Sequence, residues 1–377
     1  MRTLRDIKAL ENIPVLVRAS LNAEAVNGRV TNDFRLRRAL PTIEYLRARN
    51  ARVVLISHVS GNGTETLRPM YEAMRPWLPG LQFCEVSMGP RARAMVRELP
   101  PGGVLMLENL RRDKGEERNT RAFAAALADL ADVFVEDSFD VCHRPHASVV
   151  GVPEFLPSYA GLLVEEEVRE LSKALKPKKP ALAIVGGSKF STKQPVLKRL
   201  LRSYDRVFVG GALANDFMQA AGRPVGKSLV SQADKGALKA LMGDRKLLLP
   251  QDYVVAPFGA ARSAGRLALV ADVRPEEAIL DNGPQTIAML AERAKSAKTI
   301  LWNGPLGNYE NGFAEGTEAL AQVIAGTKAH SIVGGGDTVA AIEKLGLSEY
   351  FSFISTGGGA MLDFLAKGTL PGLEVLR

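Results

Sequence analysis

Short apolar runs alternate with helix-like segments along almost the whole of this chain of 377 residues. The runs VLVRAS at 15–20 and RVVLIS at 52–57, for example, are each followed by a segment whose apolar residues recur every three or four positions. Buried parallel strands have this continuous apolar character, and every parallel pair needs a long crossover, usually a helix. The alternation therefore predicts an α/β fold in which doubly wound parallel sheets carry helices on both faces.

The length indicates two domains, because a single hydrophobic core stops growing at roughly 250–300 residues. A charged segment with periodic leucines, LLVEEEVRELSKALK at 162–176, separates two series of apolar runs, and Pro177 and Pro180 follow it. We expect an exposed helix that bridges the domains, with the prolines marking the start of the second. The expected division is a first domain at 1–161, a hinge helix at 162–178 and a second domain at 179–357.

The composition excludes several classes of protein. Hydrophobic residues make up 46% of the chain and charged residues 24%, which is typical of a globular protein rather than a disordered one. No uninterrupted apolar stretch approaches the roughly 20 residues of a membrane helix. The first residues include Asp6 and Glu11 and lack the apolar block of a secretory signal. We therefore expect a cytoplasmic protein without membrane contact.

The net charge of +8 favours an anionic ligand. Aromatic residues make up only 6% of the chain and the basic residues are scattered, so we expect a small anion rather than a nucleic acid. The cysteines Cys84 and Cys142 lie far apart and match no spacing of metal ligands, so we expect reduced thiols.

Glycine-rich sequences follow the apolar runs of the second half, at the ends where ligands bind in open α/β sheets. One of them, IVGGGDT at 332–338, places three consecutive glycines before a helix-like run. Glycines let backbone N–H groups approach a phosphate, and the helix adds the positive end of its dipole. Asp337 could cap that helix or, beside a polyphosphate, hold Mg²⁺. The other such sequences, GGSKFSTK, GGALAND, PQD, NGPLGNYE and STGGGA, strengthen the prediction of a phosphate site.

Basic residues follow the apolar runs of the first half instead. The stretch TNDFRLRR, which we expect in a loop before a helix, adds further arginines. Arginine side chains match the oxygens of carboxylates and phosphates, so we expect a pocket for a small anion, with a solvated basic surface as the alternative. Metal binding by the histidines is disfavoured, since no second ligand stands at helical spacing. The basic residues concerned are Arg18, Arg35, Arg111, Arg144, His58, His143 and His146.

These motifs, taken in order, resemble the phosphoglycerate kinase family over essentially the whole chain. The matching stretches are TNDFRLRRALPTIEYL, LENLRRDKGEE, HRPHAS, GGSKFSTK, GKSL, ILWNGPLG, GGGDT and ISTGGGA. The resemblance implies two Rossmann-like domains of similar size joined by a hinge helix, with the segment 358–377 returning to the first domain. It also implies transfer of a phosphate between ATP and a carboxylate, which makes or consumes 1,3-bisphosphoglycerate. Mg²⁺ would accompany ATP or ADP, and we expect a monomer.

Roles for single residues follow from the same resemblance. Arg35 would stabilise the transferring phosphoryl group, with Lys189 and Gly358 completing the catalytic set, Glu310 at the ribose and Asp337 on Mg²⁺. No general base is needed, because a carboxylate is already ionised at pH 7. The expected acceptor residues are Ser20, Asn22, Arg35, His58, Arg111 and Arg144. The expected nucleotide residues are Gly187, Lys193, Gly211, Asn303, Glu310, Gly335, Gly336, Asp337 and Thr338.

The acceptor half departs from the family pattern. Where the family has R-V-D-F-N, this chain has R-A-S-L-N, so Ser20 stands in place of an aspartate. Where the family has S-H-L-G-R-P, this chain has S-H-V-S-G-N, so Gly61 stands in place of an arginine and Asn62 in place of the proline. Arg112 replaces an aromatic residue and could supply the missing charge by turning inward, while Asp140 replaces a glycine.

Three functions therefore stay open. The chain could phosphorylate 3-phosphoglycerate, it could be a paralogue that phosphorylates a related small carboxylate, or it could be a catalytically weak nucleotide-binding protein with a regulatory role. If the acceptor site has weakened, Ser20→Asp with Gly61→Arg should improve the use of 3-phosphoglycerate.

Overall fold

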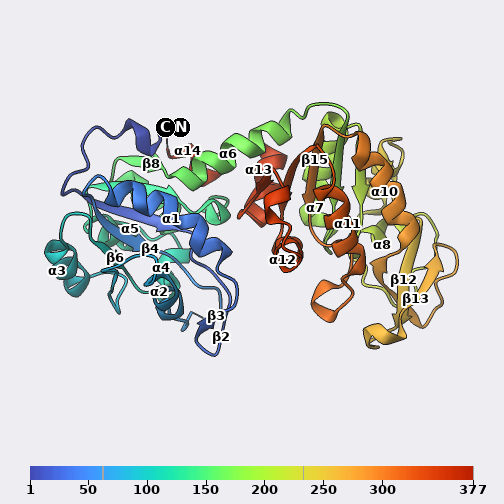
Figure 1. The fold of residues 1–377 in the computed structure, drawn as a ribbon, viewed down its shortest axis with the longest axis horizontal. Coiled ribbons are helices and arrows are strands. Elements are labelled where there is room, and N and C mark those ends of the chain that lie inside the picture. Colours follow the sequence, from blue (N-terminus) through green and yellow to red (C-terminus); the bar gives the residue numbers. More distant parts are fainter. Residues whose placement is uncertain (62, 232, 377) are drawn as a thin grey trace. The chain divides into compact units, whose positions relative to one another are not determined.

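The computed structural model describes residues 1–61, 63–231 and 233–376. The chain forms two compact units, one of Met1–Arg169 with Thr369–Arg377 and the other of Glu170–Gly368 (Figure 1). The boundary falls inside helix α6, Leu162–Leu175, and the end of the chain belongs to the first unit. There the backbone N–H of Arg2 donates to the carbonyl oxygen of Leu376 at 2.7 Å. The domain limits expected from the sequence stay predictions.

The first unit is built on a sheet of six parallel strands in the order β5-β6-β4-β1-β7-β8. β1 is central, since Val17 pairs with Leu55 of β4 and with Val135 of β7. All residues of β1 except the first are buried, as expected for a strand covered on both faces. The strands are β1 Pro14–Ala19, β4 Arg52–Ile56, β5 Gln82–Phe83, β6 Val104–Met106, β7 Val133–Asp137 and β8 Ser158–Ala160.

Helices pack on both faces of this sheet because successive residues of a strand point to opposite sides. Val17 of β1 lies in one hydrophobic core with Ile43 of α1, whereas its neighbour Leu16 lies in another with Leu127 of α5. The helices of this unit are α1 Phe34–Arg47, α2 Arg68–Met74, α3 Pro90–Glu98, α4 Lys114–Glu117, α5 Arg121–Ala128 and α14 Pro371–Glu374, and a hairpin is formed by β2 Ala25–Val26 and β3 Arg29–Val30.

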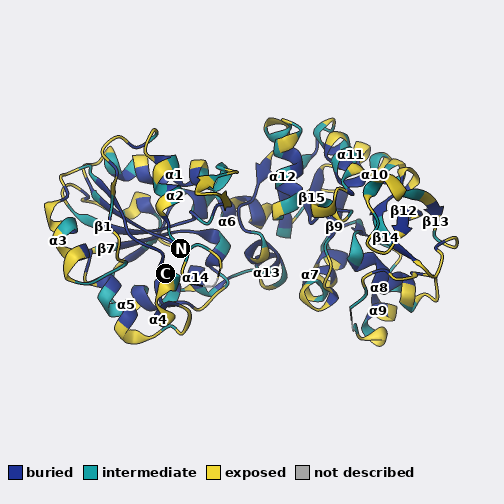
Figure 2. Cartoon of the chain, turned by 90° about the horizontal axis from the view of Figure 1, so that it is seen from below, coloured by how far each residue is buried: buried dark blue, intermediate teal, exposed yellow. Residues whose placement is uncertain are grey.

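The second unit repeats this plan with six parallel strands in the order β11-β10-β9-β15-β16-β17. Every residue of β9 and β15 is buried (dark blue in Figure 2). The two sheets confirm the α/β class predicted from the alternating runs. The strands are β9 Ala181–Val185, β10 Arg206–Val209, β11 Leu247–Leu248, β15 Thr299–Asn303, β16 His330–Gly334 and β17 Phe353–Ile354. The helices are α7 Phe190–Ser203, α8 Ala212–Ala220, α9 Lys235–Met242, α10 Pro284–Ser296, α11 Glu315–Ala325, α12 Gly336–Lys344 and α13 Gly359–Lys367.

An antiparallel sheet interrupts the alternation in the second unit. Its three strands, in the order β13-β12-β14, are β12 Asp252–Pro257, β13 Arg266–Leu269 and β14 Glu277–Asn282. The sequence pattern did not predict it, because these strands pair directly with one another and have no helix between them to produce the alternation.

Two local expectations were wrong. TNDFRLRR was expected in a loop, but α1 begins at Phe34 and continues through Pro41, because Leu36 and Ile43 are buried on its inner side. Arg35 therefore lies in the first turn of a helix. The segment at 162–176 is the expected helix, α6, but it is not simply exposed, since Leu163 and Leu171 are buried. No helix among the described residues is long and apolar enough to cross a membrane.

Candidate functional site

The three central strands of the first sheet bring distant residues together, because β4, β1 and β7 are adjacent and parallel. Their carboxyl ends lie at one edge of the sheet, so the residues that follow them meet there. Ser20 follows β1, His58 follows β4, and Asp140 lies in the short 3₁₀ turn Phe139–Val141 after β7.

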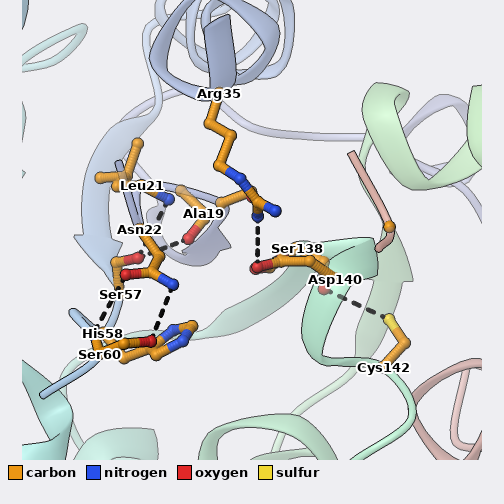
Figure 3. A network of polar contacts seen from close by, with 12 residues as sticks. Ala19, Leu21, Asn22, Arg35, Ser57, His58, Ser60, Ser138, Asp140 and Cys142 are labelled. Atoms are coloured by element: carbon orange, nitrogen blue, oxygen red, sulfur yellow. Dashed lines mark hydrogen bonds and ion pairs between the residues drawn. The ribbon is translucent and has the colours of Figure 1, made fainter. Parts of the chain in front are cut away.

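Arg35 reaches this edge from the first turn of α1 and forms an ion pair with Asp140 (Figure 3). Its Nη1 atom donates to Oδ2 of Asp140 at 2.8 Å and to the hydroxyl of Ser20 at 3.3 Å. The other carboxylate oxygen, Oδ1, accepts a hydrogen bond from the hydroxyl of Ser138 at 2.7 Å. Burial would raise the pKa of Asp140, but Arg35 and the other neighbouring groups outweigh it and hold that pKa well below its usual range. Asp140 is therefore an ionised partner of Arg35.

Arg18 is fully buried beneath the site and braces it. Its Nε donates to the hydroxyl of Ser148 at 2.9 Å, and that hydroxyl donates to Glu116 at 2.6 Å. Its Nη2 lies 3.0 Å from Nδ1 of His58. A guanidinium can only donate, so Nδ1 accepts and the imidazole carries its proton on Nε2. The sequence did not indicate this relay through Ser148 and Glu116, which are separated from Arg18 by more than ninety residues.

Arg111 and Arg144 carry the positive charge that an anion would need. Atoms Nε and Nη2 of Arg111 are buried and make no hydrogen bond within the described part of the chain. Nε lies 3.4 Å from Glu117, which is an ion-pair contact only. Burial, followed by the nearby charge of Arg144, lowers the pKa of Arg111, and the same two arginines together with burial lower the pKa of His146 to about 4. Guanidinium N–H groups left without partners are ready to bind phosphate oxygens.

Arg112 does not supply the charge of the arginine that is missing from the loop after His58. Arg112 pairs with Glu108 at 3.1 Å and donates to the carbonyl oxygens of Thr64 and Glu65, so its charge serves this loop. It does not turn inward. Asn22 holds the same loop by exchanging two hydrogen bonds of 3.0 Å with Ser60. Asn62 lies outside the described residues.

A cavity of about 350 Å³ opens at the carboxyl ends of the strands in the second unit. Its volume is in the range of small-molecule sites. Several expected nucleotide residues line it, together with residues of β14 and of the loop after β15. The expected residues on its wall are Gly187, Gly211, Glu310 and Asp337.

Lys193 lies in the first turn of α7, with its side chain over the glycine turn that follows β9. A Cβ atom at Gly187 would lie 3.4 Å from Cε of Lys193, so a larger residue would crowd the lysine. Burial lowers the pKa of Lys193 to about 8. No neighbouring carboxylate of the described chain offsets this effect. The N-terminal end of α7 adds the positive partial charge of the helix dipole. These features favour a bound phosphate.

The glycine run before α12 approaches the cavity. Gly335 has φ of 105°, a conformation that favours glycine, and the space above Gly336 is open. Asp337 follows in the first turn of α12, where burial and the charge of Glu310 raise its pKa. Oγ1 of Thr338 is buried without a hydrogen-bond partner in the described chain. Two neighbouring acidic groups next to open backbone N–H groups suit a phosphate that is accompanied by a cation.

Other expected residues lie off the cavity wall. Asn303 is buried at the end of β15, with its Nδ2 atom 3.4 Å from the sulfur of Met361. Lys189 is exposed at the N-cap of α7, and Gly358, with φ of 50°, is the N-cap of α13.

Sequence reasoning missed several residues of the cavity wall, among them Asp281, Leu229 and Phe258. Burial raises the pKa of Asp281 to about 7. Phe258 is 72% exposed and offers an apolar surface to a flat ring. Recognising β12 and β14 as strands would have drawn attention to Phe258 and Asp281, since Phe258 follows β12 directly and Asp281 lies in β14.

Among groups of three or more His, Cys, Asp or Glu side chains, none in the described residues is arranged to hold a metal ion. Asp337, beside the glycine run that precedes α12, is the candidate ligand for a cation that a bound phosphate would help to hold.

Comparison with known proteins gives one consistent family. The family model described as phosphoglycerate kinase matches residues 4–368. The phosphoglycerate kinase of Moorella thermoacetica is 44% identical over 99% of this chain and 98% of that relative. A phosphoglycerate kinase of Thermus thermophilus is 43% identical over 100% of both chains.

Solved structures agree with these relatives. Phosphoglycerate kinase from Pyrococcus horikoshii OT3 superposes with a TM-score of 0.88 at 30% identity and covers 100% of this chain and 98% of that one. Phosphoglycerate kinase from Coxiella burnetii superposes with a TM-score of 0.83 at 37% identity and covers 99% of this chain and 98% of that one.

Proposed function

The chain belongs to the phosphoglycerate kinase family, and from this premise we propose that it transfers a phosphoryl group reversibly between ATP and 3-phosphoglycerate. A carboxylate oxygen of 3-phosphoglycerate attacks the γ-phosphorus of ATP, the bond to the bridging oxygen breaks, and ADP and 1,3-bisphosphoglycerate are formed. The observation that carries this conclusion is the full-length relationship to phosphoglycerate kinases at more than 40% identity.

The first unit would bind the acceptor. Arg111 and Arg144 supply charge for its phosphate, and the unpaired N–H groups of Arg111 support that role. Arg35 is proposed to stabilise the transferring phosphoryl group, since Asp140 and Ser20 engage only its Nη1 atom, which leaves the three N–H donors on Nε and Nη2. Asn22 and His58 would complete this half, with His58 offering Nε2–H as a neutral donor.

The second unit would bind the nucleotide. We place the nucleoside in the cavity beside Glu310 and Phe258, and the phosphates against Lys193 and the loop that precedes α12. Gly187, Gly211, Gly335 and Gly336 allow close approach, and Thr338 offers a buried hydroxyl. Asn303 would act behind the cavity wall. Lys189 and Gly358, at the N-caps of α7 and α13, are proposed to assist the transferring group.

Asp337 is the proposed ligand of Mg²⁺. Its carboxylate is an oxygen ligand of the kind that Mg²⁺ prefers. Burial and Glu310 raise its pKa, so its negative charge would be stabilised by a cation bound beside it. Bound Mg²⁺ would neutralise phosphate charge during transfer.

No residue is needed to activate the acceptor. Its carboxyl group is ionised at neutral pH, so the catalytic task is to place two anions together and to stabilise the charge that develops. The buried basic residues of the first unit and the loops of the second serve these two tasks. We further expect a monomer in the cytoplasm that acts on small molecules only and does not bind nucleic acid.

The test is a turnover assay with the full-length protein and Mg-ATP. ADP release is followed with 3-phosphoglycerate, with glycerate, which lacks the phosphate, and with glycerol 3-phosphate, which lacks the carboxylate. Hydroxylamine traps the acyl phosphate product as a hydroxamate. We expect turnover of about 1–1,000 s⁻¹ with Mg-ATP and 3-phosphoglycerate, and no turnover with glycerate or glycerol 3-phosphate.

Two results would replace this conclusion by an alternative. Faster turnover with another carboxylate would identify a paralogue with a different acceptor. Nucleotide binding without turnover of any carboxylate would support the regulatory role.

A further inference from the structure

The candidate acceptor site contains the carboxylate of Asp140, although position 20 carries a serine. The resemblance to the family implies an aspartate at position 20 and a glycine at position 140, whereas this chain has Ser20 and Asp140. Both side chains contact the same atom, Nη1 of Arg35, from different strand ends, as Figure 3 shows for Arg35 and Asp140. A carboxylate at either position could therefore reach the same guanidinium.

The contact to Asp140 is the stronger of the two. It is an ion pair of 2.8 Å, whereas the neutral hydroxyl of Ser20 lies at 3.3 Å. Hydrogen bonds between charged groups are shorter and stronger than neutral ones. The Asp140 side chain is only 8% exposed and Ser138 holds its second oxygen, so the carboxylate has a fixed position.

Arg35 needs such a partner. Its side chain is 29% exposed, and a long arginine side chain has many rotamers open to it unless a partner fixes one of them. The pair with Asp140 commits Nη1 and leaves Nε and Nη2 for the oxygens of a transferring phosphoryl group. A fixed guanidinium stabilises a transition state without reorganisation, which a mobile one cannot do.

We propose that Asp140 is the positioning residue for Arg35 and that it replaces, from the end of β7, the carboxylate that the family carries at position 20 after β1. Relative to the pattern that the resemblance implies, this chain has no negative charge after β1 and one after β7, at the same arginine. This inference rests on the proposed function, because it assigns Arg35 to the phosphoryl transfer. It also means that the acceptor site has been rebuilt rather than lost.

The test moves the carboxylate back. Four variants of the full-length chain are compared with the wild type: Asp140→Gly, Asp140→Asn, Ser20→Asp, and Ser20→Asp with Asp140→Gly. We expect kcat to fall by about ten- to a hundredfold in both Asp140 variants, as for one lost charge-assisted bond, with the KM for ATP within about twofold of the wild type.

The double variant is the decisive one. It should recover kcat to within about threefold of the wild type, because the aspartate introduced after β1 would pair with Arg35. Ser20→Asp alone should lower kcat, since two carboxylates would then crowd one guanidinium beside an anionic acceptor. Asp129→Asn is the matched control, because Asp129 forms an exposed ion pair with Arg93 at 2.9 Å on the outside of the unit.

A spectroscopic readout separates this inference from the proposed function. In protein labelled with ¹⁵N-arginine, the guanidinium Nη–H signal that disappears in Arg35→Lys belongs to Arg35, whose Nη1 atom donates to Asp140. We expect that signal to be slowly exchanging in the wild type, to be lost in Asp140→Asn and to return in the double variant. An inactive wild type would count against the proposed function, whereas this signal decides on Asp140 in either case.

Either of two results overturns the proposal. One is an Asp140→Asn variant with the kcat and Arg35 signal of the wild type. The other is a folded double variant, verified by its thermal unfolding, that is no better than Asp140→Gly in both readouts.

Discussion

Nη2 of Arg18 lies 3.0 Å from Nδ1 of His58, and this contact fixes the protonation of a buried imidazole. Burial and the charge of Arg18 hold the pKa of His58 well below its usual range. Burial, with Arg111 and Arg144, likewise lowers the pKa of His146 to about 4. Both rings therefore stay neutral in the folded chain at a pH where an unfolded histidine, with a pKa of about 6.5, becomes charged.

We expect these histidines to make stability depend on pH. An unfolded chain binds more protons than the folded one below about pH 6.5, so their contribution is complete above that pH and is lost as the pH falls. The free energy of unfolding should decrease by up to about 1.4 kcal/mol per pH unit for each histidine between pH 6.5 and its folded pKa. Urea unfolding of wild type and His146→Gln between pH 7 and 4.5 measures this. Equal slopes for the two proteins would contradict the assignment.

Arg35 should be essential for turnover. We expect Arg35→Ala to lower kcat by at least about a hundredfold, as for one electrostatic contact made in the transition state, and to leave the KM for ATP nearly unchanged. Arg37→Ala is the matched control, since Arg37 lies in the same helix in an exposed pair with Asp33 at 2.8 Å. Near-normal turnover of Arg35→Ala would show that Arg35 is a surface charge with no role in catalysis.

Asp337 should control the effect of Mg²⁺ on nucleotide binding. Calorimetry with ADP, with and without Mg²⁺, is expected to show that Asp337→Asn loses most of the Mg²⁺-dependent gain in affinity. Without Mg²⁺, Asp337→Asn should bind ADP as tightly as the wild type or more tightly, because a negative charge beside the phosphates is removed. Asp272→Asn, at an exposed position after β13, serves as the control. If Asp337→Asn keeps the full gain, the cation lies elsewhere.

Lys193 should make ADP binding sensitive to pH. Its pKa is lowered to about 8, so it is protonated at neutral pH and loses its charge as the pH rises through that value. Above pH 8 binding must take up a proton, and the affinity should fall by up to about tenfold per pH unit. Lys193→Arg, whose guanidinium stays charged, should remove this dependence, whereas Lys198→Arg in the same helix should keep it. A flat pH profile for the wild type would argue against a phosphate contact.

The structure changes the expectation for Ser20→Asp with Gly61→Arg. Asp140 already provides a carboxylate for Arg35, and a Cβ atom at Gly61 would collide with Oε1 of Glu65 unless that side chain moved. A new arginine there would meet Glu65 before any substrate. We therefore expect no gain in kcat/KM for 3-phosphoglycerate from this pair of substitutions. A gain of about tenfold or more in steady-state kinetics would show that the acceptor site had weakened, as the sequence suggested.

Part of the site could be predicted because it depends on local sequence. The run IVGGGDT indicated a strand, a glycine turn and a helix, and the structure forms them as β16, Gly335 and α12. Failures arose where a local signal was ambiguous. TNDFRLRR was expected in a loop before a helix, but buried side chains such as Leu36 extend α1 back to Phe34, which moves Arg35 from a loop to a helix.

The sequence by itself determined the α/β class and the glycine turns at the strand ends of the second half, because strand burial and backbone freedom depend on neighbouring residues. It also showed the concentration of arginines in the first half. Only the tertiary structure decided which of these side chains meet. Arg35 and Asp140 are 105 residues apart, and they pair because α1, which follows β1, begins at the edge of the sheet where the neighbouring strand β7 ends. Arg112 donates to the carbonyl oxygens of Thr64 and Glu65 for a similar reason, since β4 and β6, which precede these residues, are adjacent in the sheet. Such contacts depend on the order of the strands, which no short stretch of the chain contains.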